Sequence, residues 1–363
     1  MLKSNFKNYF LFLSFFCKKK REKESNKEKE RKKTLLKNYL EEYFKIFTVF
    51  FIIFFSMLVT GCQQEKSEKS VLALDTVITL TAKGENSREV LNESANYLTN
   101  LDKLASFDEY SELNLLNKVE IKDFIKVSPE IYDMLSLGKY YTDFTKKNYD
   151  ISAGALVNLW DKNRKSETLP NKEDILFAKS TVNADNFLLI DGKVKKSNAN
   201  TKITFGGIAK GYAADKIYSL YKAKNVTGFM NFGTSTILAC GDKTYRVGIK
   251  NPRDEEKMLG VVTLKNEVLS TSGDYERYFI KNNVRYHHII DPFTGYPTNN
   301  GIASVTVIVP LSFEHAGVVS DVLSTALMVA GAQGEEFLPA GVKALFVTTD
   351  GKLVFVNGFE LEK

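Results

Sequence analysis

The sequence predicts an α+β fold with largely antiparallel sheets and packed helices. Three observations favour this class over a doubly wound fold: strand candidates outnumber helix candidates, short turns join many neighbouring strands, and no internal repeat of about 20–50 residues is present. The 363 residues are 44% hydrophobic and 26% charged. This is the composition of a globular protein, which excludes collagen-like, low-complexity and polytopic membrane proteins.

The first predicted elements are a strand, two helices and a hairpin. Residues 71–82 are rich in β-branched side chains and predict the opening strand. Apolar residues recur at helical spacing over 87–107, and a second helix, 128–144, begins with the N-terminal pair Ser-Pro. An Asp-Gly pair at its centre predicts that 185–203 forms a hairpin.

The later elements follow from the same two patterns, period 2 for strands and period 3.6 for helices. A glycine turn leads into the predicted helix 209–222, and a run of apolar residues marks the predicted helix 320–330. The predicted strands are 228–239, 246–249, 260–264, 278–280 and 302–309, and the predicted helices are 209–222 and 320–330.

The positive charge of the chain is concentrated in its N-terminal part. Residues 1–61 carry 14 Lys or Arg and 6 Asp or Glu, whereas the remainder carries 36 and 38, so the body has no net positive charge for binding nucleic acid. We expect the charge-rich run 18–37 to be disordered or exposed on the cytoplasmic side. The uncharged stretch 46–59 would span about 21 Å as a helix, less than the hydrocarbon core of about 30 Å, which favours a signal segment.

That stretch ends in Leu-Val-Thr-Gly-Cys62, which resembles a bacterial lipobox, whose cysteine is lipidated as the first residue of the mature protein. We therefore expect 1–61 to be a basic lead-in with a lipoprotein signal segment, 62–70 a polar tether, and 71–363 the folded domain. The lipid would anchor the domain in the cell membrane on the extracytoplasmic side. The alternative is a plain transmembrane anchor with an incidental cysteine, and the lead-in 1–34 reflects either a misplaced start codon or a basic extension.

Cysteine usage bears on how the body is held together. The chain has three cysteines, Cys17, Cys62 and Cys240. With Cys17 removed and Cys62 lipidated, Cys240 has no partner, so the exported domain must rely on its apolar core. The same count excludes a cysteine-based metal site.

The first motif that could take part in binding or catalysis is ITFGGIAKGYAAD at 203–215. Paired glycines before a helix bring the backbone close to a ligand, and the helix N-terminus favours phosphate. Lys210 supplies a positive charge there. The motif is not a P-loop, and a tight strand-to-helix turn is the structural alternative.

The second motif comprises 269–277 (LSTSGDYER) and 286–297 (YHHIIDPFTGYP). Adjacent histidines, His287 and His288, would point to opposite faces of a strand, so at most one is expected to reach a given site. A histidine with a pKa of about 6.5 can take a proton from a hydroxyl near neutral pH. The simpler interpretation of Asp291 is a turn-capping residue.

The third motif is SDVLSTAL at 320–327. On a helix Asp321 and Thr325 lie one turn apart on the same face, where they present hard oxygen ligands suited to Mg²⁺ rather than Zn²⁺. The structural alternative is an N-capping Asp with a buried Thr.

These motifs, with three others, resemble the ApbE family in order and over residues 71–357. The family comprises FAD:protein FMN transferases, also called flavin-trafficking lipoproteins. The segments that carry the resemblance are 74–76 (LDT), 106–107 (SF) to 111–114 (SELN), 149–160 (YDISAGALVNLW), 206–215, 272–275, 288–292 and 321–325.

The resemblance implies a Mg²⁺-dependent transfer of the FMN half of FAD to a Ser or Thr hydroxyl of another protein, with AMP as the leaving group. By similarity, His288 is the base, and the Mg²⁺ ligands are Asp321, Ser324, Thr325 and the backbone carbonyl of Gly207. The positions that match the FAD surroundings are Leu74, Phe107, Asn148, Tyr149, Asp150, Lys210 and Ile290. The implied partner is an exported or membrane acceptor protein, typically an electron-transfer subunit.

The chain departs from the family pattern at three places. Thr204 stands where many members have Asp, Gly233-Thr234 where many have Gly-Gly, and Leu74-Asp75 where others have Met-Gly. We expect altered affinity rather than lost activity. Because Ala153 occupies the esterified position of an acceptor-like motif, the chain is not expected to be its own acceptor.

Three alternatives to the transferase remain open at the level of sequence. The same site could hydrolyse the FAD pyrophosphate with water as acceptor, or the chain could be a flavin-carrying lipoprotein without turnover. A structural or solute-binding lipoprotein is disfavoured, because it would not need the predicted base, lysine and metal ligands together. Trp160 is interpreted as a core residue rather than a stacking partner for a ligand.

Overall fold

The computed structural model describes residues 19, 27–31, 33–35, 39–48, 66–106, 108–118 and 121–362. The chain divides into two units, 1–63 and 64–363. The described residues of the first unit are exposed, as expected, and they are helical rather than disordered. Lys and Glu are good helix formers and can pair at i,i+4, which accounts for this difference. The signal-segment residues 49–59 and the predicted lipidation site Cys62 lie outside the described residues.

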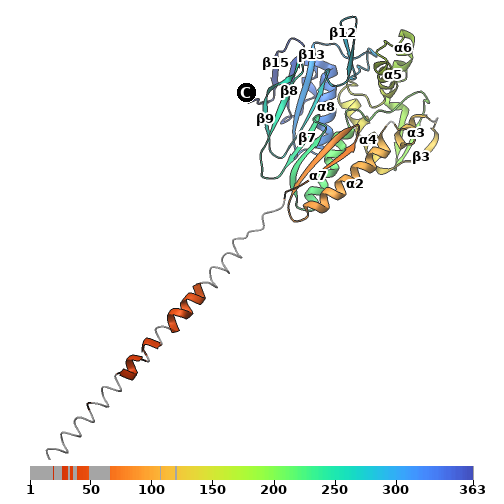
Figure 1. Cartoon of the computed structure of the whole chain (residues 1–363). Coiled ribbons are helices and arrows are strands. Elements are labelled where there is room, and N and C mark those ends of the chain that lie inside the picture. Colours follow the sequence, from red (N-terminus) through yellow and green to blue (C-terminus); the bar gives the residue numbers. More distant parts are fainter. Residues whose placement is uncertain are drawn as a thin grey trace, which may run out of the picture. The chain divides into compact units, whose positions relative to one another are not determined.

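The second unit is built on one large sheet of eight strands, in the order β1-β2-β6-β7-β10-β13-β14-β15 (Figure 1). Every neighbouring pair is antiparallel. The strands are β1 (Lys66–Ala73), β2 (Thr76–Lys83), β6 (Thr227–Phe232), β7 (Thr236–Cys240), β10 (Glu267–Gly273), β13 (Ile302–Pro310), β14 (Lys343–Thr348) and β15 (Leu353–Val356). The predicted α+β class is confirmed.

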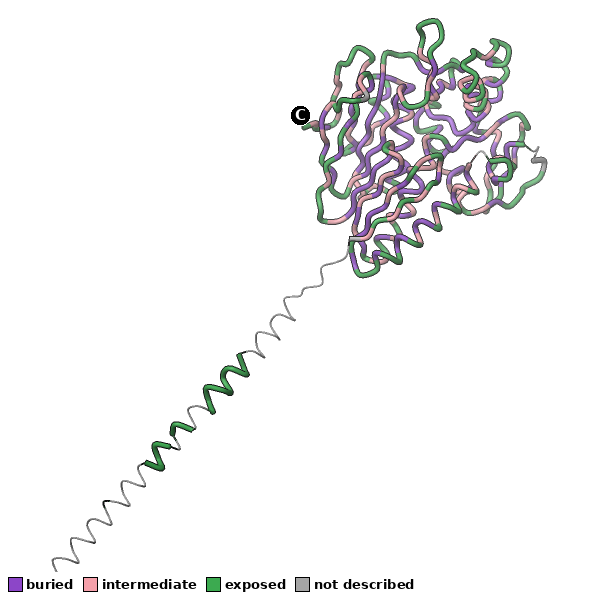
Figure 2. Tube along the Cα trace, in the orientation of Figure 1, coloured by how far each residue is buried: buried purple, intermediate pink, exposed green. Residues whose placement is uncertain are grey.

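The main core lies between this sheet and three helices on one of its faces: α2 (Ser87–Ala105), α7 (Ala209–Ala223) and α8 (Ala316–Ala330). The hairpin β8 (Tyr245–Asn251) and β9 (Asp254–Leu264) covers part of the other face with a second apolar cluster. Figure 2 shows the buried residues gathered in the strands and in the helix faces turned toward them.

Shorter elements complete the unit around one end of the sheet. The helices are α3 (Glu112–Lys118), α4 (Pro129–Phe144), α5 (Gly154–Lys165), α6 (Lys172–Ser180), η1 (Ala184–Asn186) and η2 (Gly331–Phe337). The strands are β3 (Ile121–Lys126), β4 (Phe187–Ile190), β5 (Lys193–Lys196), β11 (Tyr278–Lys281) and β12 (Val284–His287). Together they bring α5 and the β11–β12 hairpin next to the motifs singled out in the sequence.

Among the described residues, one helical stretch, Ala316–Phe337, is apolar and long enough to span a membrane by length and composition alone. Its apolar window is 78% buried inside the folded unit. This burial is what the central helix of a packed core shows, and it explains why the stretch lacks a polar face.

The predicted opening strand is wrong in one respect: it is two strands. β1 and β2 form a hairpin whose two turn residues, Leu74 and Asp75, have φ of 51° and 58°. β1 also begins at Lys66, so residues 66–70, expected in the tether, are paired with β2. Residues 71–82 contain neither Gly nor Asn, and apolar and β-branched residues lie on both sides of the turn, so the sequence pattern did not reveal it.

Most other predicted elements are confirmed. The helix expected over 87–107 is α2, and the helix expected from Ser128 is α4, where the Ser128 hydroxyl accepts a hydrogen bond from the Ile131 N–H at 3.4 Å. The predicted hairpin at 185–203 is β4–β5. The expected helix at 320–330 starts four residues earlier, because Asp215 of α7 caps it by accepting from the N–H groups of Gly317 and Val318.

A buried lysine on β5 gives the first testable prediction. Lys196 is 1% exposed and donates to the Leu116 carbonyl at 2.8 Å, and burial, aided by the nearby positive charge of Lys202, lowers its pKa to about 8. Between this pKa and the higher pKa of the unfolded chain, the unfolded state holds a proton that the folded state has released. The free energy of unfolding should therefore rise with pH from about 8 to 10 more steeply than in Lys196→Met.

Urea unfolding across this pH range measures the difference, with Lys193→Met on the same strand as an exposed control. Equal pH slopes for the wild type and Lys196→Met would contradict the assignment.

Candidate active site

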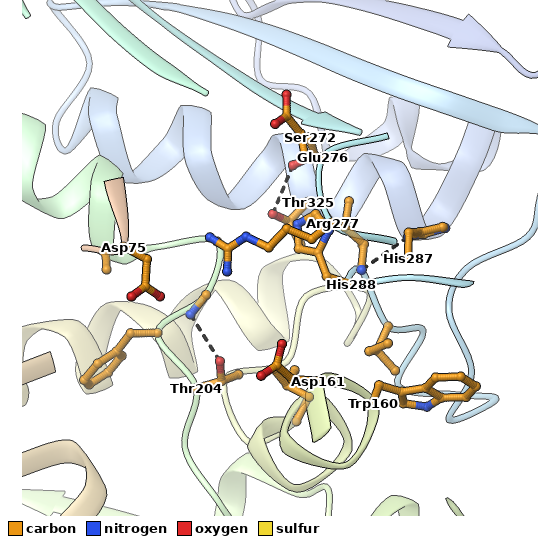
Figure 3. Close-up of a pocket in the computed structure, with 18 of the residues that line it drawn as sticks. Asp75, Trp160, Asp161, Thr204, Ser272, Glu276, Arg277, His287, His288 and Thr325 are labelled. Atoms are coloured by element: carbon orange, nitrogen blue, oxygen red, sulfur yellow. Dashed lines mark hydrogen bonds between the residues drawn. The ribbon is translucent and has the colours of Figure 1, made fainter. Parts of the chain in front are cut away.

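One cavity of about 930 Å³ is lined by nearly all the described residues that the sequence analysis assigned to the site (Figure 3). Its walls come from the β1–β2 turn, the end of α2, segment 148–150, helix α5, loop 204–210, the end of β10, the β11–β12 hairpin and α8. A volume of this size matches a large cofactor or dinucleotide. Phe107, one of the predicted flavin contacts, lies outside the described residues.

The predicted metal ligands meet where loop 204–210 faces α8. Asp321 and Thr325 both line the cavity, one turn apart. Gly207 lies against them with φ of +79°, and a Cβ atom there would be 2.7 Å from Thr325 Oγ1. Glycine is therefore required at this position for two reasons, its backbone conformation and the close approach.

Asp321 is buried, and one of its carboxylate oxygens accepts a hydrogen bond from the Gly211 N–H at 2.9 Å. Burial raises its pKa, and the nearby Lys210 cation opposes this effect. A carboxylate, a hydroxyl and a backbone carbonyl are hard oxygen donors of the kind Mg²⁺ prefers. Within the described residues no group of three or more His, Cys, Asp or Glu could hold a metal, so a cation here would need ligand oxygens from a substrate and water.

Ser324 is placed differently from the other predicted ligands. It is buried and does not line the cavity; its hydroxyl donates to the Asp321 carbonyl at 2.9 Å and pairs with the Ser272 hydroxyl at 2.9 Å. Ser272 does line the cavity, and it lies 3.3 Å from Thr325 Oγ1. The site thus gains a residue that sequence reasoning quoted within a motif but did not assign.

The two adjacent histidines have different environments. His287 is buried, its Nε2 lies 2.8 Å from the Thr298 carbonyl, and its Nδ1 accepts from the Ile289 N–H. Both of its ring nitrogens therefore serve the backbone. Nδ1 of His288, in contrast, is buried with no hydrogen-bond partner among the described residues. Of the two, His288 is the one whose ring keeps a nitrogen without a hydrogen-bond partner in the described part of the chain.

Burial lowers the pKa of His288 to about 3, helped by the positive charges of Arg277 and Lys210. The imidazole is therefore neutral between about pH 5 and 8, the state in which it can accept a proton. In ¹H–¹⁵N spectra of the chain, the His288 ring signals, assigned by their loss in His288→Asn, should not shift between these pH values. A titration midpoint near 6.5 would contradict this environment.

Lys210 and Thr204 lie at the entrance to α7. Lys210 is largely enclosed, its ammonium donates to the Ser235 hydroxyl, and burial lowers its pKa while Asp321 raises it. Thr204 accepts from the Gly206 N–H at 3.2 Å and so holds the glycine turn. The first N–H groups of helix α7 already have partners: Ala209 donates to the Phe205 carbonyl at 3.0 Å, and Gly211 donates to the Asp321 carboxylate at 2.9 Å. This end of the cavity therefore offers the Lys210 cation to an anionic ligand.

The predicted flavin positions other than Phe107 all line the cavity: Leu74, Asn148, Tyr149, Asp150, Lys210 and Ile290. Asn148 donates to the Thr145 carbonyl, and Asp150 accepts from the N–H and hydroxyl of Ser152, so both are held by the backbone turn before α5. The Tyr149 hydroxyl is buried without a partner among the described residues. It is a hydroxyl that a bound ligand could satisfy.

The wall formed by α5 was only partly expected. Trp160 is buried in a small apolar cluster, as predicted for a core residue; its ring stacks on Tyr286 at 5.7 Å and its N–H donates to the Gly295 carbonyl. Charged residues of the same helix also line the cavity, namely Asp161, Lys162, Arg164 and Lys165. Their sequence pattern is that of any solvated helix face, so no signal distinguished them.

Hard oxygen donors, an enclosed lysine and a neutral histidine lie around one dinucleotide-sized cavity. Together they define an enzyme site for a phosphate-bearing substrate. The ApbE family profile matches residues 74–346, and this chain belongs to the ApbE family. The resemblance drawn from the motifs is thereby confirmed.

Relatives with assigned functions agree with this membership. The FAD:protein FMN transferase of Haemophilus influenzae is 29% identical over 242 residues, which cover 63% of this chain and 68% of that protein. The FAD:protein FMN transferase of Treponema pallidum is 29% identical over 254 residues, with 63% and 68% covered.

Solved structures show the same fold. The ApbE protein of Thermotoga maritima superposes with a TM-score of 0.72 at 29% identity, covering 80% of this chain and 97% of that one. The flavinyl transferase ApbE of Pseudomonas stutzeri, in its apo form, gives a TM-score of 0.70 at 25% identity, covering 82% and 95%.

Proposed function

We propose that this chain transfers the FMN half of FAD to a Ser or Thr hydroxyl of an acceptor protein and releases AMP, in a reaction that requires Mg²⁺. The proposal rests on one observation: the proposed metal ligands Asp321 and Thr325, the cation Lys210 and the base His288 all line the same cavity. The relatives named FAD:protein FMN transferase support the choice of substrate.

The proposed step is a displacement at the FMN phosphorus of FAD. The acceptor oxygen forms a P–O bond to that phosphorus, the bond from phosphorus to the bridging oxygen breaks, and its electron pair leaves with AMP. The hydroxyl proton passes to the neutral ring of His288, whose unpartnered nitrogen suits a base. Lys210 holds the pyrophosphate in place through its positive charge.

Asp321, Thr325 and the backbone carbonyl of Gly207 are the residues that would hold Mg²⁺. Bound there, the ion would neutralise pyrophosphate oxygens as negative charge moves to the leaving group. The protein's own contribution is the rigid placement of these donors: Gly207 against Thr325, and Asp321 fixed by the Gly211 N–H.

We also propose that Cys62 carries a lipid and that the acceptor is an exported or membrane protein, such as an electron-transfer subunit. The lipobox-like sequence before Cys62 supports the first point. Palmitate labelling in a bacterial host tests it, because the label should be incorporated by the wild type and lost in Cys62→Ala.

Product analysis tests the transfer itself. The full chain, FAD and Mg²⁺ are incubated with and without a peptide containing Asp-Gly-Ala-Ser-Gly-Ala-Thr, and nucleotides are separated by chromatography. We expect AMP to appear in a one-to-one ratio with flavinylated peptide. AMP together with free FMN, at the same rate in both samples, would instead identify a hydrolase, and unchanged FAD would identify a flavin carrier.

A further inference from the structure

The turn between β1 and β2 is strained and lies at the active-site cavity. Both turn residues, Leu74 and Asp75, are in the left-handed region, with φ of 51° and 58°. Hairpin turns of this kind favour Asn and Gly, which adopt positive φ at little cost. Strained residues that persist at a ligand cavity are often retained for a contact they make there. Leu74 and Asp75 both line the cavity.

The turn is held by a residue of another element, helix α2. Asp102 of α2 accepts a hydrogen bond from the Leu74 N–H at 2.7 Å, which fixes the conformation without help from the Asp75 side chain. Asp75 is exposed and forms no hydrogen bond or ion pair with the described residues. Its carboxylate therefore has no hydrogen bond or ion pair among the described residues that would hold the turn.

The surroundings of Asp75 indicate what it can bind. Figure 3 shows it across the cavity from His288, with the side chain of Arg277 reaching between them. Its negative charge is near enough to Lys210 to raise the pKa of that lysine. A carboxylate repels phosphate but accepts hydrogen bonds from hydroxyls, and acidic residues hold ribose hydroxyls in this way in other nucleotide sites. In FAD, hydroxyl-bearing carbons flank the pyrophosphate on both sides.

We propose that Asp75 is a specificity-determining contact whose carboxylate accepts a hydrogen bond from a hydroxyl of FAD, in the ribityl chain or the ribose, while Lys210 takes the neighbouring phosphate. This assignment rests on the proposed function. It also gives the Asp at this position a role that a plain turn residue would not have.

Asp75→Gly separates the contact from the strain, because glycine removes the carboxylate and also relaxes the turn. We expect the melting temperature to rise and the dissociation constant for FAD, measured by flavin fluorescence with the full chain and Mg²⁺, to increase about tenfold. Asp75→Asn, which keeps the shape and removes the charge, should weaken binding less. The matched control is Glu167→Gly, since Glu167 is also acidic, exposed and left-handed (φ 50°) but does not line the cavity.

FMN and AMP, titrated separately, identify the half of FAD that carries the hydroxyl: only the half in contact should bind Asp75→Gly more weakly. If Asp75→Gly is stabilised while its affinity for FAD and for both halves equals that of the wild type, the proposal is overturned and Asp75 is a turn residue only. Failure of the wild type to bind FAD at all would instead overturn the proposed function.

Discussion

Asp321→Asn is expected to lower the rate of FMN transfer by about a thousandfold, the largest effect of any single substitution we foresee. The reason is the loss of the only carboxylate among the proposed metal ligands, and metal-assisted charge neutralisation contributes several kcal/mol to such reactions. Asn can still accept the hydrogen bond from the Gly211 N–H, so the fold should be kept. Initial rates of AMP release at saturating FAD, over a range of Mg²⁺ concentrations, measure the effect.

The matched control is Ser324→Ala on the same helix. Ser324 does not line the cavity, and its loss removes hydrogen bonds to Ser272 and the Asp321 carbonyl only. We expect a less than tenfold change in rate, in line with the modest value of such bonds. If Asp321→Asn were as active as Ser324→Ala, the placement of the metal at Asp321 would be wrong.

Gly211→Ala is expected to lower the free energy of unfolding by about 3 kcal/mol, the largest structural effect. Helices α7 and α8 cross here at backbone contact: a Cβ on Gly211 would lie 2.2 Å from the Gly317 carbonyl oxygen and 2.8 Å from Asp321 Cβ. The helices must separate to admit the methyl group, and Asp321 must move with α8. Urea unfolding should show the loss of stability, and transfer activity should fall with it.

Ser219→Ala provides the control, because Ser219 is an exposed residue of the same helix. Alanine favours helix at an exposed position, so its effect should stay within about 0.5 kcal/mol. A stable, fully active Gly211→Ala variant would show that the two helices tolerate a wider spacing than the structure gives them.

The spacing of apolar residues predicted those elements in which buried and exposed positions alternate regularly along the chain. Helix α2 presents one apolar face to the core, and its apolar spacing marked it in the sequence. Helix α4 was marked instead by its Ser128-Pro129 start. The β1–β2 turn has no local signal, because Leu74 and Asp75 are held at positive φ by Asp102, a residue of another element. Conformations that are imposed by tertiary contacts cannot be predicted from local patterns.

In the site, too, local spacing predicted some residues, whereas others depend on tertiary contacts. The pair Asp321 and Thr325 was predictable, because helical spacing alone places both on one face. That His288 rather than His287 has a ring nitrogen without a partner depends on Thr298, which lies in the following loop. The approach of Asp75 to Lys210 depends on the sheet order, which joins β2 to β6. Such long-range contacts carry no signature in one sequence.

Intact mass spectrometry of the acceptor tests the central claim most directly. The full chain is incubated with FAD, Mg²⁺ and the acceptor peptide, in parallel with Asp321→Asn and with a chelator. We predict that the peptide gains the mass of one FMN less one water in the first sample alone. An unmodified peptide in the presence of bound, Mg²⁺-supplemented FAD would contradict the assignment of this chain as a flavin transferase.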